Sequence, residues 1–146
     1  FSDIPNLVYT RQVVDEVLRL YPPAWGVGRL ALEDDEIDGY HIPKGTNFII
    51  VAFLAHRRPE IWEDPLAFKP ERWADNFARK LPKFAYFPFG GGPRMCIGNN
   101  FALMEMTILL ATLAQHFNPK LTPDAFPEYD SLITLRPKGE VPMRFV

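Results

Sequence analysis

The segment that most limits how this chain can fold is residues 57–92, "RRPEIWEDPLAFKPERWADNFARKLPKFAYFPFGGG", which proline interrupts repeatedly. Proline has no amide hydrogen to donate and clashes with the preceding helical turn, so it ends helices and is excluded from central strands. We therefore predict only short helical turns here, in a loop of a length that is usually functional when ordered. Proline supplies 15 of the 146 residues, about twice its average share, which favours short elements throughout.

Helical periodicity is clear on either side of this segment. Residues 9–21 are predicted to form a helix that ends at Pro22 and Pro23. Its apolar stripe consists of Val13, Val14, Val17, Leu18 and Tyr21. Residues 99–117 are predicted to form a second helix, apolar nearly all round and therefore buried. Its apolar residues include Phe101, Leu103, Ile108, Leu109, Ala111 and Leu113.

The remaining stretches have the patterns of strands. Residues 24–57 are predicted to form strands, among them a buried strand over 47–55 that follows a turn at "IPKGT". The acidic run at 33–38 is expected to be a solvated loop, and the residues after Lys120 to form one or two short hairpins. We expect an α+β fold, mainly helical, with no domain boundary within residues 1–146.

Composition narrows the class of protein. A hydrophobic share of 47% with 23% charged residues is typical of a globular chain. The net charge of −2 and the lack of a basic stripe with interleaved aromatics argue against nucleic-acid binding. A single cysteine excludes an intrachain disulfide and a cysteine-cluster metal site. No apolar run approaches the roughly 18 residues of a membrane span. The first residues do not resemble a signal peptide, and the low cysteine content weakly favours the cytoplasm.

The one cysteine, Cys96, lies in the stretch "FPFGGGPRMCIGNN", just before the second predicted helix. Helix starts carry partial positive charge and unpaired amide hydrogens, which stabilise a thiolate. Glycines at 90, 91, 92 and 98 permit positive φ and close approach of a bulky group. Arg94 can hold a carboxylate bidentately, and Phe89 can shield the sulfur. A haem with a cysteine thiolate on its iron would use all of these groups.

The same residues leave two other interpretations open. Cys96 could be a buried, inert residue beside a glycine-rich turn. It could also be a catalytic nucleophile, although no histidine lies close to it in the sequence. A phosphate-binding P-loop is excluded because no Gly-Lys-Ser/Thr follows the glycines.

The decapeptide "FGGGPRMCIG" resembles the F-x-x-G-x-R-x-C-x-G signature of the cytochrome P450 family of haem-thiolate monooxygenases at every fixed position. Those positions are Phe89, Gly92, Arg94, Cys96 and Gly98. The resemblance implies that they surround haem b, that Cys96 is its axial thiolate and catalytic group, and that Arg94 binds a haem carboxylate. It also implies that Arg29 binds a haem carboxylate, whereas its position alone indicates a strand arginine facing water.

Two further signatures resemble the family in the expected order. "EVLR" supplies Glu16 and Arg19 of an E-x-x-R pattern, and "FKPERW" supplies Arg72 of a P-E-R-F/W pattern. The resemblance implies a buried ion-pair triad that locks the long loop under the haem. The sequence pattern alone predicts an exposed i,i+3 pair, since Glu16 and Arg19 lie opposite the apolar stripe of their helix.

The resemblance also implies contacts with substrate and with an electron donor. Possible substrate contacts are Ala24, Trp25, Val27, Ile133 and Thr134. Arg79, Lys80 and Lys83 would lie on the face where a ferredoxin or flavoprotein reductase docks, and basic side chains would steer an acidic partner. The alternatives are ordinary packing for the first group and ordinary solvated charges for the second.

The resemblance covers essentially the whole chain but only about the C-terminal third of the family's fold. No A-G-x-x-T motif of the oxygen-binding helix is present. We expect a C-terminal fragment, inactive by itself, whose missing N-terminal part completes a monooxygenase for O2 and a small hydrophobic substrate. An N-terminal membrane anchor outside the chain is compatible with this expectation. The alternatives are a chain that assembles with a separate protein, a haem-binding or sensing module without turnover, and a structural fragment without haem.

Overall fold

The computed structural model describes residues 3–122 and 128–145. The helices are α1 (Val8–Leu20), α2 (Ala52–Ala55), α3 (Phe77–Lys80) and α4 (Asn99–His116), with short 3-10 turns at Ile4–Asn6, Pro70–Asn76 and Gly92–Arg94. The strands are β1 (Val27–Leu30), β2 (Asp35–Ile37), β3 (Tyr40–Ile42), β4 (Asn47–Ile50), β5 (Pro119–Leu121), β6 (Tyr129–Ser131), β7 (Leu135–Pro137) and β8 (Met143–Phe145). This mixture of helices and small strand pairs confirms the predicted α+β class.

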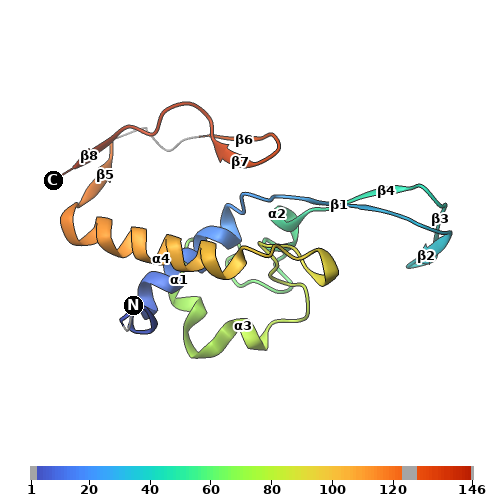
Figure 1. The fold of residues 1–146 in the computed structure, drawn as a ribbon, viewed down its shortest axis with the longest axis horizontal. Helices are drawn as coiled ribbons and strands as arrows, with labels where there is room; N and C mark the ends of the chain where they lie inside the picture. Colours follow the sequence, from blue (N-terminus) through green and yellow to red (C-terminus); the bar gives the residue numbers. More distant parts are fainter. Residues whose placement is uncertain (1–2, 123–127, 146) are drawn as a thin grey trace.

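In the part of the chain that the structure describes, the strands form four separate antiparallel pairs. β1 pairs with β4, with Arg29 opposite Phe48, and β2 pairs with β3 at the tip of that hairpin. The result is a long arm that extends away from the helices (Figure 1). β6 pairs with β7 in a short hairpin, as expected for the tail, and β5 pairs with β8 on either side of that hairpin in the sequence. The part of the tail prediction that falls on residues 123–127 lies outside the described residues.

Helices α1 and α4 pack against each other in the body of the molecule (Figure 1). α1 ends just before Pro22 and Pro23, as predicted, and the Tyr21 amide closes its last turn by donating to the Val17 carbonyl over 2.7 Å. The core is drawn mainly from α1 and from the proline-rich segment. Its buried apolar side chains are Val14, Leu18, Leu20, Ala52, Trp62, Trp73, Ala85, Phe87 and Leu135.

The proline-rich segment 57–92 contains only short helical turns, as predicted, and packs against α1. Aromatic side chains hold it there. The ring centroids of Trp62 and Trp73 lie 5.7 Å apart, and those of Trp73 and Tyr86 lie 4.6 Å apart. Such aromatic clusters combine a large buried apolar area with favourable ring geometry, which gives a segment with little regular structure a defined conformation.

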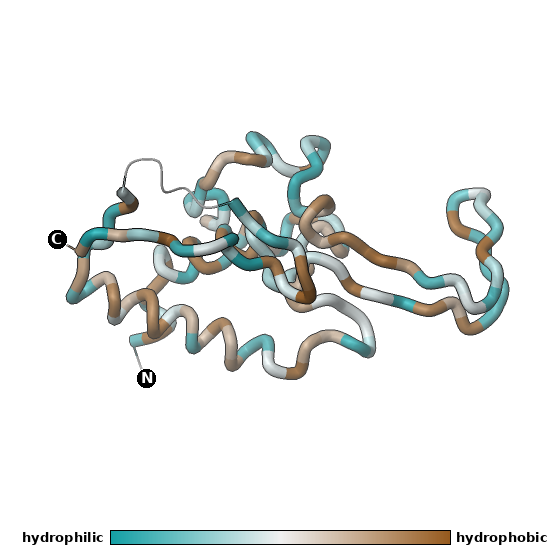
Figure 2. Tube along the Cα trace, turned by 90° about the horizontal axis from the view of Figure 1, so that it is seen from above, coloured by the Kyte–Doolittle hydropathy of each residue, from teal (hydrophilic) through white to brown (hydrophobic). Residues whose placement is uncertain are grey.

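The buried strand predicted over 47–55 is wrong in two respects. β4 ends at Ile50, and residues 52–55 form α2 instead, because the Phe53 amide bonds to the Trp25 carbonyl and the following amides bond within the turn. The strand is also uncovered: Ile49 is 65% exposed, and hydrophobic residues recur along the projecting arm (Figure 2). In the acidic run, Asp35–Ile37 is exposed as expected but forms strand β2 rather than a loop.

Helix α4 has the predicted position, but it is not buried. Thr107 is its one buried residue, whereas Phe101, Leu109 and Leu113 are each more than half exposed. α1 covers one side of α4, and no other described element covers the rest to a similar extent. The apolar stripe predicted for α1 is also incomplete, since Val17 is 41% exposed. Among residues 3–122 and 128–145, no helix combines the length and apolar character needed to cross a bilayer.

Candidate functional site

Residues 87–98, called the cysteine loop below, present Cys96 immediately before α4, separated from Asn99 by Ile97 and Gly98. The loop is folded by its own backbone, because the Cys96 amide donates to the Phe89 carbonyl over 3.0 Å and the Met95 amide donates to the Gly92 carbonyl over 3.1 Å. The thiol is exposed. This exposure disagrees with the interpretation of Cys96 as an inert residue buried in the core of this chain.

Two of the four glycines in the loop adopt the left-handed conformation for which glycine was expected. Gly90 has a φ of 74° and Gly92 a φ of 69°, which side chains with a Cβ disfavour. Gly91 is extended, but a Cβ there would lie 2.5 Å from the Phe84 ring. Gly98 has a φ of −87° as the N-cap of α4, and a Cβ there would lie 3.9 Å from Cys96 Sγ. The backbone therefore favours glycine at 90 and 92, whereas at 91 it is the Phe84 ring that leaves no room for a Cβ.

Arg29, far away in the sequence, lies against the glycines of the cysteine loop. One guanidinium nitrogen of Arg29, Nη2, donates to the Gly91 carbonyl over 3.3 Å, and Nη1 donates to the Gly28 carbonyl over 2.8 Å. Arg29 is half-buried and lines a cavity of about 470 Å³ between the β1–β4 arm and the loop. Arg94, in the 3-10 turn of the loop, is exposed. The fold thus brings a second guanidinium to the loop that carries the thiol.

Glu16, Arg19 and Arg72, the residues of the E-x-x-R and P-E-R-W signatures, come together where α1 faces the proline-rich segment. Arg19 binds Glu16 through two hydrogen bonds of 2.9 Å, from Nε to Oε2 and from Nη2 to Oε1, and Arg72 Nε donates to Glu16 Oε1 over 3.1 Å. Glu16 and Arg19 have no exposed side-chain surface, and Arg72 retains 8%. The exposed pair that the helix pattern predicts is wrong here, because the proline-rich segment covers the face of α1 opposite its apolar stripe.

Glu16 accepts two further hydrogen bonds, from the Lys69 amide and from the Trp73 indole, each over 2.9 Å. Burial by itself would raise the pKa of the Glu16 carboxyl. The hydrogen bonds from Arg19, Lys69 and Trp73 and the charge of Arg19 outweigh burial and hold that pKa below its ordinary value. Glu16 is therefore a buried carboxylate that stays ionised.

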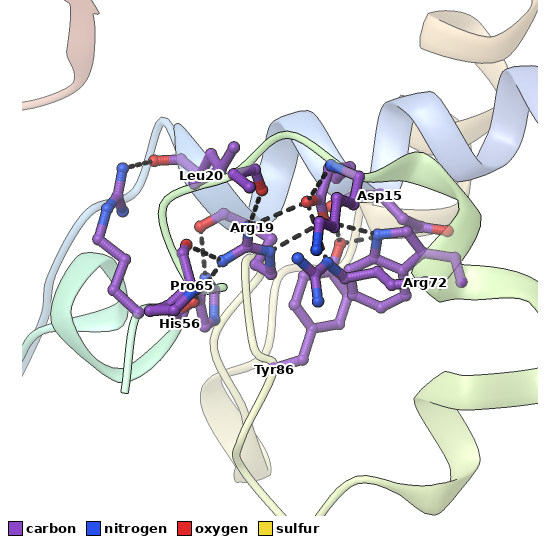
Figure 3. Close-up of polar contacts among 12 residues, drawn as sticks. Asp15, Arg19, Leu20, His56, Pro65, Arg72 and Tyr86 are labelled. Carbon is purple, nitrogen blue, oxygen red and sulfur yellow. Dashed lines mark hydrogen bonds and ion pairs between the residues drawn. The ribbon is translucent and has the colours of Figure 1, made fainter. Parts of the chain in front are cut away.

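Arg19 ties the proline-rich segment to α1 (Figure 3). Its Nη1 donates to the carbonyls of His56 and Pro65 over 2.8 and 2.7 Å, and its Nη2 donates to the Ala67 carbonyl over 3.1 Å. The guanidinium also lies 5.1 Å from the centre of the Trp62 ring. A single side chain thus satisfies two carbonyls of the proline-rich segment and the carbonyl of His56, just before it.

His56, to which the sequence assigned no role, lies beside Arg19 (Figure 3) and also contacts the start of the cysteine loop. It has no exposed surface. The Phe87 amide donates to His56 Nε2 over 2.9 Å, and His56 Nδ1 lies 3.3 Å from the Arg19 carbonyl. Burial, together with the charges of Arg19 and Arg57, lowers the pKa of His56 to about 4. The only sequence signal was that His56 belongs to a stretch resembling the family.

Tyr86 makes a second connection between α1 and the start of the cysteine loop. Its hydroxyl donates to the backbone carbonyl or to Oδ1 of Asp15, each 3.1 Å away. Burial and the negative charge of Asp15 raise the pKa of Tyr86 well above its ordinary value. Asp15 also pairs with Arg11 over 2.9 Å. Nothing in the sequence distinguished Tyr86 from its aromatic neighbours.

The two stretches expected to contact substrate lie together. The Trp25 indole donates to the Leu132 carbonyl over 2.8 Å, and the Leu135 amide donates to the Pro23 carbonyl over 2.9 Å. Ile133, on the turn between these contacts, is 97% exposed. Exposed residues of these two stretches also include Ala24 and Thr134, while Trp25 and Val27 are half-buried.

The basic residues expected near an electron donor all face solvent. Arg79 and Lys80 lie in the last turn of α3, and Lys83 follows three residues later. The Lys83 ammonium lies 5.2 Å from the centre of the Phe84 ring. Phe84 in turn lies beside Gly91, so this basic stretch is continuous with the cysteine loop.

Comparison with known proteins agrees with this geometry. The cytochrome P450 family model matches residues 1–142. The chain is 40% identical to cyclooctat-9-en-7-ol 5-monooxygenase of Streptomyces melanosporofaciens over 123 residues, which are 84% of this chain and 27% of that enzyme. It spans about 30% of the length of the curated relatives it matches.

Solved structures share the fold. The retinoic acid-bound cyanobacterial CYP120A1 has a TM-score of 0.90 and 34% identity, covering 99% of this chain and 34% of that one. The haem domain of cytochrome P450DA has a TM-score of 0.86 and 31% identity, and the match covers 94% of this chain and 30% of that one. Haem b is the cofactor of this family. Because the family model covers nearly the whole sequence and solved relatives share its fold at more than 30% identity, the chain belongs to the cytochrome P450 family.

Proposed function

We propose that residues 1–146 are the C-terminal haem-binding portion of a haem-thiolate monooxygenase, forming part of a single larger domain with no internal boundary. The observation that carries this proposal is the exposed thiol of Cys96. It is presented by a loop that its own backbone hydrogen bonds hold in place at the start of a helix. A thiolate at a helix start is stabilised by the local partial positive charge.

The residues present fit haem b by the chemistry of their donor groups. Cys96 offers a free sulfur for the iron, and Arg94 and Arg29 offer guanidinium groups for the two carboxylates. The glycines lack a Cβ that would crowd a bulky group: nothing lies within 4 Å of the Cβ position of Gly92, and the Cβ position of Gly98 lies 3.9 Å from Cys96 Sγ. The Phe89 carbonyl accepts a hydrogen bond from the Cys96 amide, and Phe89 would lie against the haem on the side of the Cys96 sulfur. When bound, haem would supply the activation of O2.

The reaction we propose inserts one oxygen atom of O2 into a small hydrophobic organic substrate. The second oxygen atom leaves as water, with two electrons from a redox partner and two protons from solvent. A curated relative is named as a monooxygenase of cyclooctat-9-en-7-ol, which supports a mainly apolar substrate. The segments joined by Trp25 support a substrate-facing edge, with Ile133 exposed on it. The proposed contacts are Ala24, Trp25, Val27, Ile133 and Thr134.

A ferredoxin or a flavoprotein reductase would deliver the electrons. We place its docking surface near Arg79, Lys80 and Lys83, because these cations are exposed and continuous with the cysteine loop. Basic side chains accelerate encounter with an acidic partner. Glu16, Arg19 and Arg72 have a structural role in this proposal: they hold the proline-rich segment and, through it, the loop.

This chain supplies the thiolate side of the site, and the remainder of the fold would supply the oxygen-binding side. The exposed apolar face of α4 supports this division, since such a face is normally covered in a folded enzyme. The coverage of about 30% of the relatives' length supports it as well. The chain by itself would be inactive, because one wall cannot enclose both haem and substrate.

The absorbance spectrum of the reduced, carbon monoxide-bound protein tests the ligand. We expect the red-shifted band of thiolate-ligated haem in the wild type and its loss in Cys96→Ser. The matched control is Met95→Leu, which removes the neighbouring, half-exposed sulfur and should keep the band. A Cys96→Ser protein that retains the wild-type band would overturn the proposal. In the complete protein that contains this chain, a band without oxygenation under any reductant would favour the haem-sensing alternative, and no haem uptake at all would favour a structural fragment.

A further inference from the structure

The cysteine loop is attached to the body of the molecule by a histidine that does not touch the thiol. The Phe87 amide, at the start of the loop, donates to His56 Nε2 over 2.9 Å. Nε2 must therefore be unprotonated, and the single proton of a neutral imidazole must lie on Nδ1. Nδ1 lies 3.3 Å from the Arg19 carbonyl, which can only accept. Both contacts are satisfied by one tautomer of the neutral ring and by no other form.

The contact with Arg19 is reciprocal, which makes it rigid. The His56 ring faces the Arg19 carbonyl, and Arg19 Nη1 donates to the His56 carbonyl over 2.8 Å. The same guanidinium is held by Glu16 through two hydrogen bonds. The His56 ring also packs against the rings of Tyr86 and Phe87, with centroids 5.2 Å apart in each case. His56 is therefore oriented by the buried ion pairs on one side and by the loop on the other.

A short series of backbone contacts leads from His56 to the sulfur. The Phe87 carbonyl accepts the Gly90 amide over 2.9 Å, and the Phe89 carbonyl accepts the Cys96 amide over 3.0 Å. The glycines between these contacts are flexible by nature, so the loop depends on its ends for a defined position. A shift at Phe87 would move the carbonyl that holds Cys96. His56 is the described side chain that bonds directly to the Phe87 amide.

We propose that His56 is a positioning residue for the Cys96 thiolate: its imidazole, protonated on Nδ1, fixes the start of the cysteine loop to α1 and thereby keeps the sulfur on the haem iron. This inference rests on the proposed function, because its main readout is haem ligation. It predicts that the acceptor at Nε2 matters for ligation, whereas the donor at Nδ1 mainly orients the ring.

Two amide variants of His56 test the roles of Nε2 and Nδ1 separately. In His56→Gln, Oε1 lies as many bonds from Cα as Nε2 does, so it can accept the Phe87 amide. In His56→Asn, Nδ2 replaces Nδ1, so the donor to Arg19 remains but the acceptor for Phe87 is lost. Leu18→Ala is the matched control, because Leu18 is buried in α1 and its truncation destabilises the fold without removing a hydrogen bond to the loop.

The experiment uses the complete haem-loaded protein that contains this chain, in the reduced, carbon monoxide-bound state. The measured quantity is the ratio of thiolate-ligated to thiolate-free haem. We expect His56→Asn to lower this ratio about fivefold or more, the effect of one lost buried hydrogen bond, and His56→Gln and Leu18→Ala to keep it near the wild-type value. The inference is overturned if Asn and Gln lower the ratio equally, if Asn leaves it unchanged, or if Leu18→Ala lowers it as far as Asn.

A second measurement remains informative if His56→Asn does not fold. Nitrogen NMR of the wild-type protein in the same diamagnetic state should show His56 protonated on Nδ1 and not on Nε2. A ring protonated on Nε2 contradicts the inference, since Nε2 could then not accept the Phe87 amide. Absence of a thiolate band in the wild type itself would be a failure of the proposed function, and is thereby distinguished from a failure confined to the His56 variants.

Discussion

Glu16 carries a negative charge with no exposed surface, and its hydrogen-bond partners explain why that charge is tolerated. Its carboxylate accepts hydrogen bonds from Arg19, Arg72, Trp73 and the Lys69 amide. An ionised carboxylate is costly to bury unless it is paired in this way. The pairing joins α1 to residues 69–73 of the proline-rich segment, so one residue connects elements that lie far apart in the sequence.

The free energy of unfolding should depend on pH because His56 binds a proton in the unfolded chain. Its pKa is about 4 in the folded chain and 6.5 when unperturbed, so between these values the unfolded chain binds a proton that the folded chain does not. Stability is therefore complete above about pH 6.5, falls as the pH drops toward 4, and loses roughly 3 kcal/mol over that window. Urea unfolding at a series of pH values measures it.

His56→Gln is the control for this pH prediction, because glutamine does not titrate and should abolish the loss between pH 6.5 and 4. Glu16 contributes equally to the curves of both proteins, so their difference reports His56 alone. The pKa of Glu16 is lowered from 4.5, so the stability it contributes is lost only as the pH falls below that value. A wild-type curve parallel to that of His56→Gln through the window would contradict the prediction.

Most of the elements are too short to be stable alone, and contacts between distant segments define their positions. α2 is a single turn held at Trp25, and β7 begins where the Leu135 amide bonds to the Pro23 carbonyl. The Trp25 indole adds a third contact, to the Leu132 carbonyl. The tail hairpin formed by β6 and β7 is thus attached to the chain that follows α1, and its turn is left exposed.

Replacing Trp25 with Phe should loosen this attachment while keeping most of the apolar contact. The lost hydrogen bond to Leu132 is worth about 1 kcal/mol, so we expect the Leu135 amide to exchange its hydrogen several-fold faster, with little change in global stability. Hydrogen exchange followed by NMR measures this. Tyr40→Phe, an exposed change on the distant arm, is the control. Equal exchange rates in Trp25→Phe and wild type would show that the indole does not hold the hairpin.

At the scale of the whole molecule, apolar surface exceeds what this chain can cover. α4 exposes Phe101, Leu109 and Leu113, and the arm exposes Ile49 and Ile50. On α4, Leu109 and Leu113 lie one turn apart and so expose adjacent apolar surface. Exposed apolar surface of this kind marks an interface or a liability to aggregate. In a complete P450 fold, the remaining part of the domain would cover it, which agrees with the share of the relatives that this chain spans.

The isolated chain should therefore self-associate and bind apolar dyes. Sedimentation at several concentrations and dye fluorescence measure both. The double variant Leu109→Glu and Leu113→Glu should reduce dye binding and shift the chain toward monomer, because it places charge on the exposed side of α4. The control is the double variant Lys80→Glu and Lys83→Glu, which also introduces two glutamates but at exposed polar positions. A wild-type chain that is monomeric and binds little dye would contradict the expectation.

Local pattern predicted much of the element order. The end of α1 follows from Pro22 and Pro23, and the short turns of the proline-rich segment follow from its prolines. The cysteine loop was identifiable because the residues of its signature are adjacent in sequence. The extent of β4 and the burial of α4 were predicted wrongly, since both depend on what covers these elements, and a hydrophobic pattern indicates only that a surface can be buried.

By itself the sequence determined the family signatures, the helix boundary at the two prolines and the position of Cys96 before α4, because these depend on neighbouring residues. Only the tertiary structure decided between the exposed pair that the helix pattern predicts and the buried Glu16 and Arg19 that the resemblance implies. It alone decided that Arg29 lies against Gly91 and that His56 connects Arg19 to Phe87. Those contacts join residues brought together by packing, and an amino-acid pattern does not encode which distant carbonyl or amide a side chain will reach.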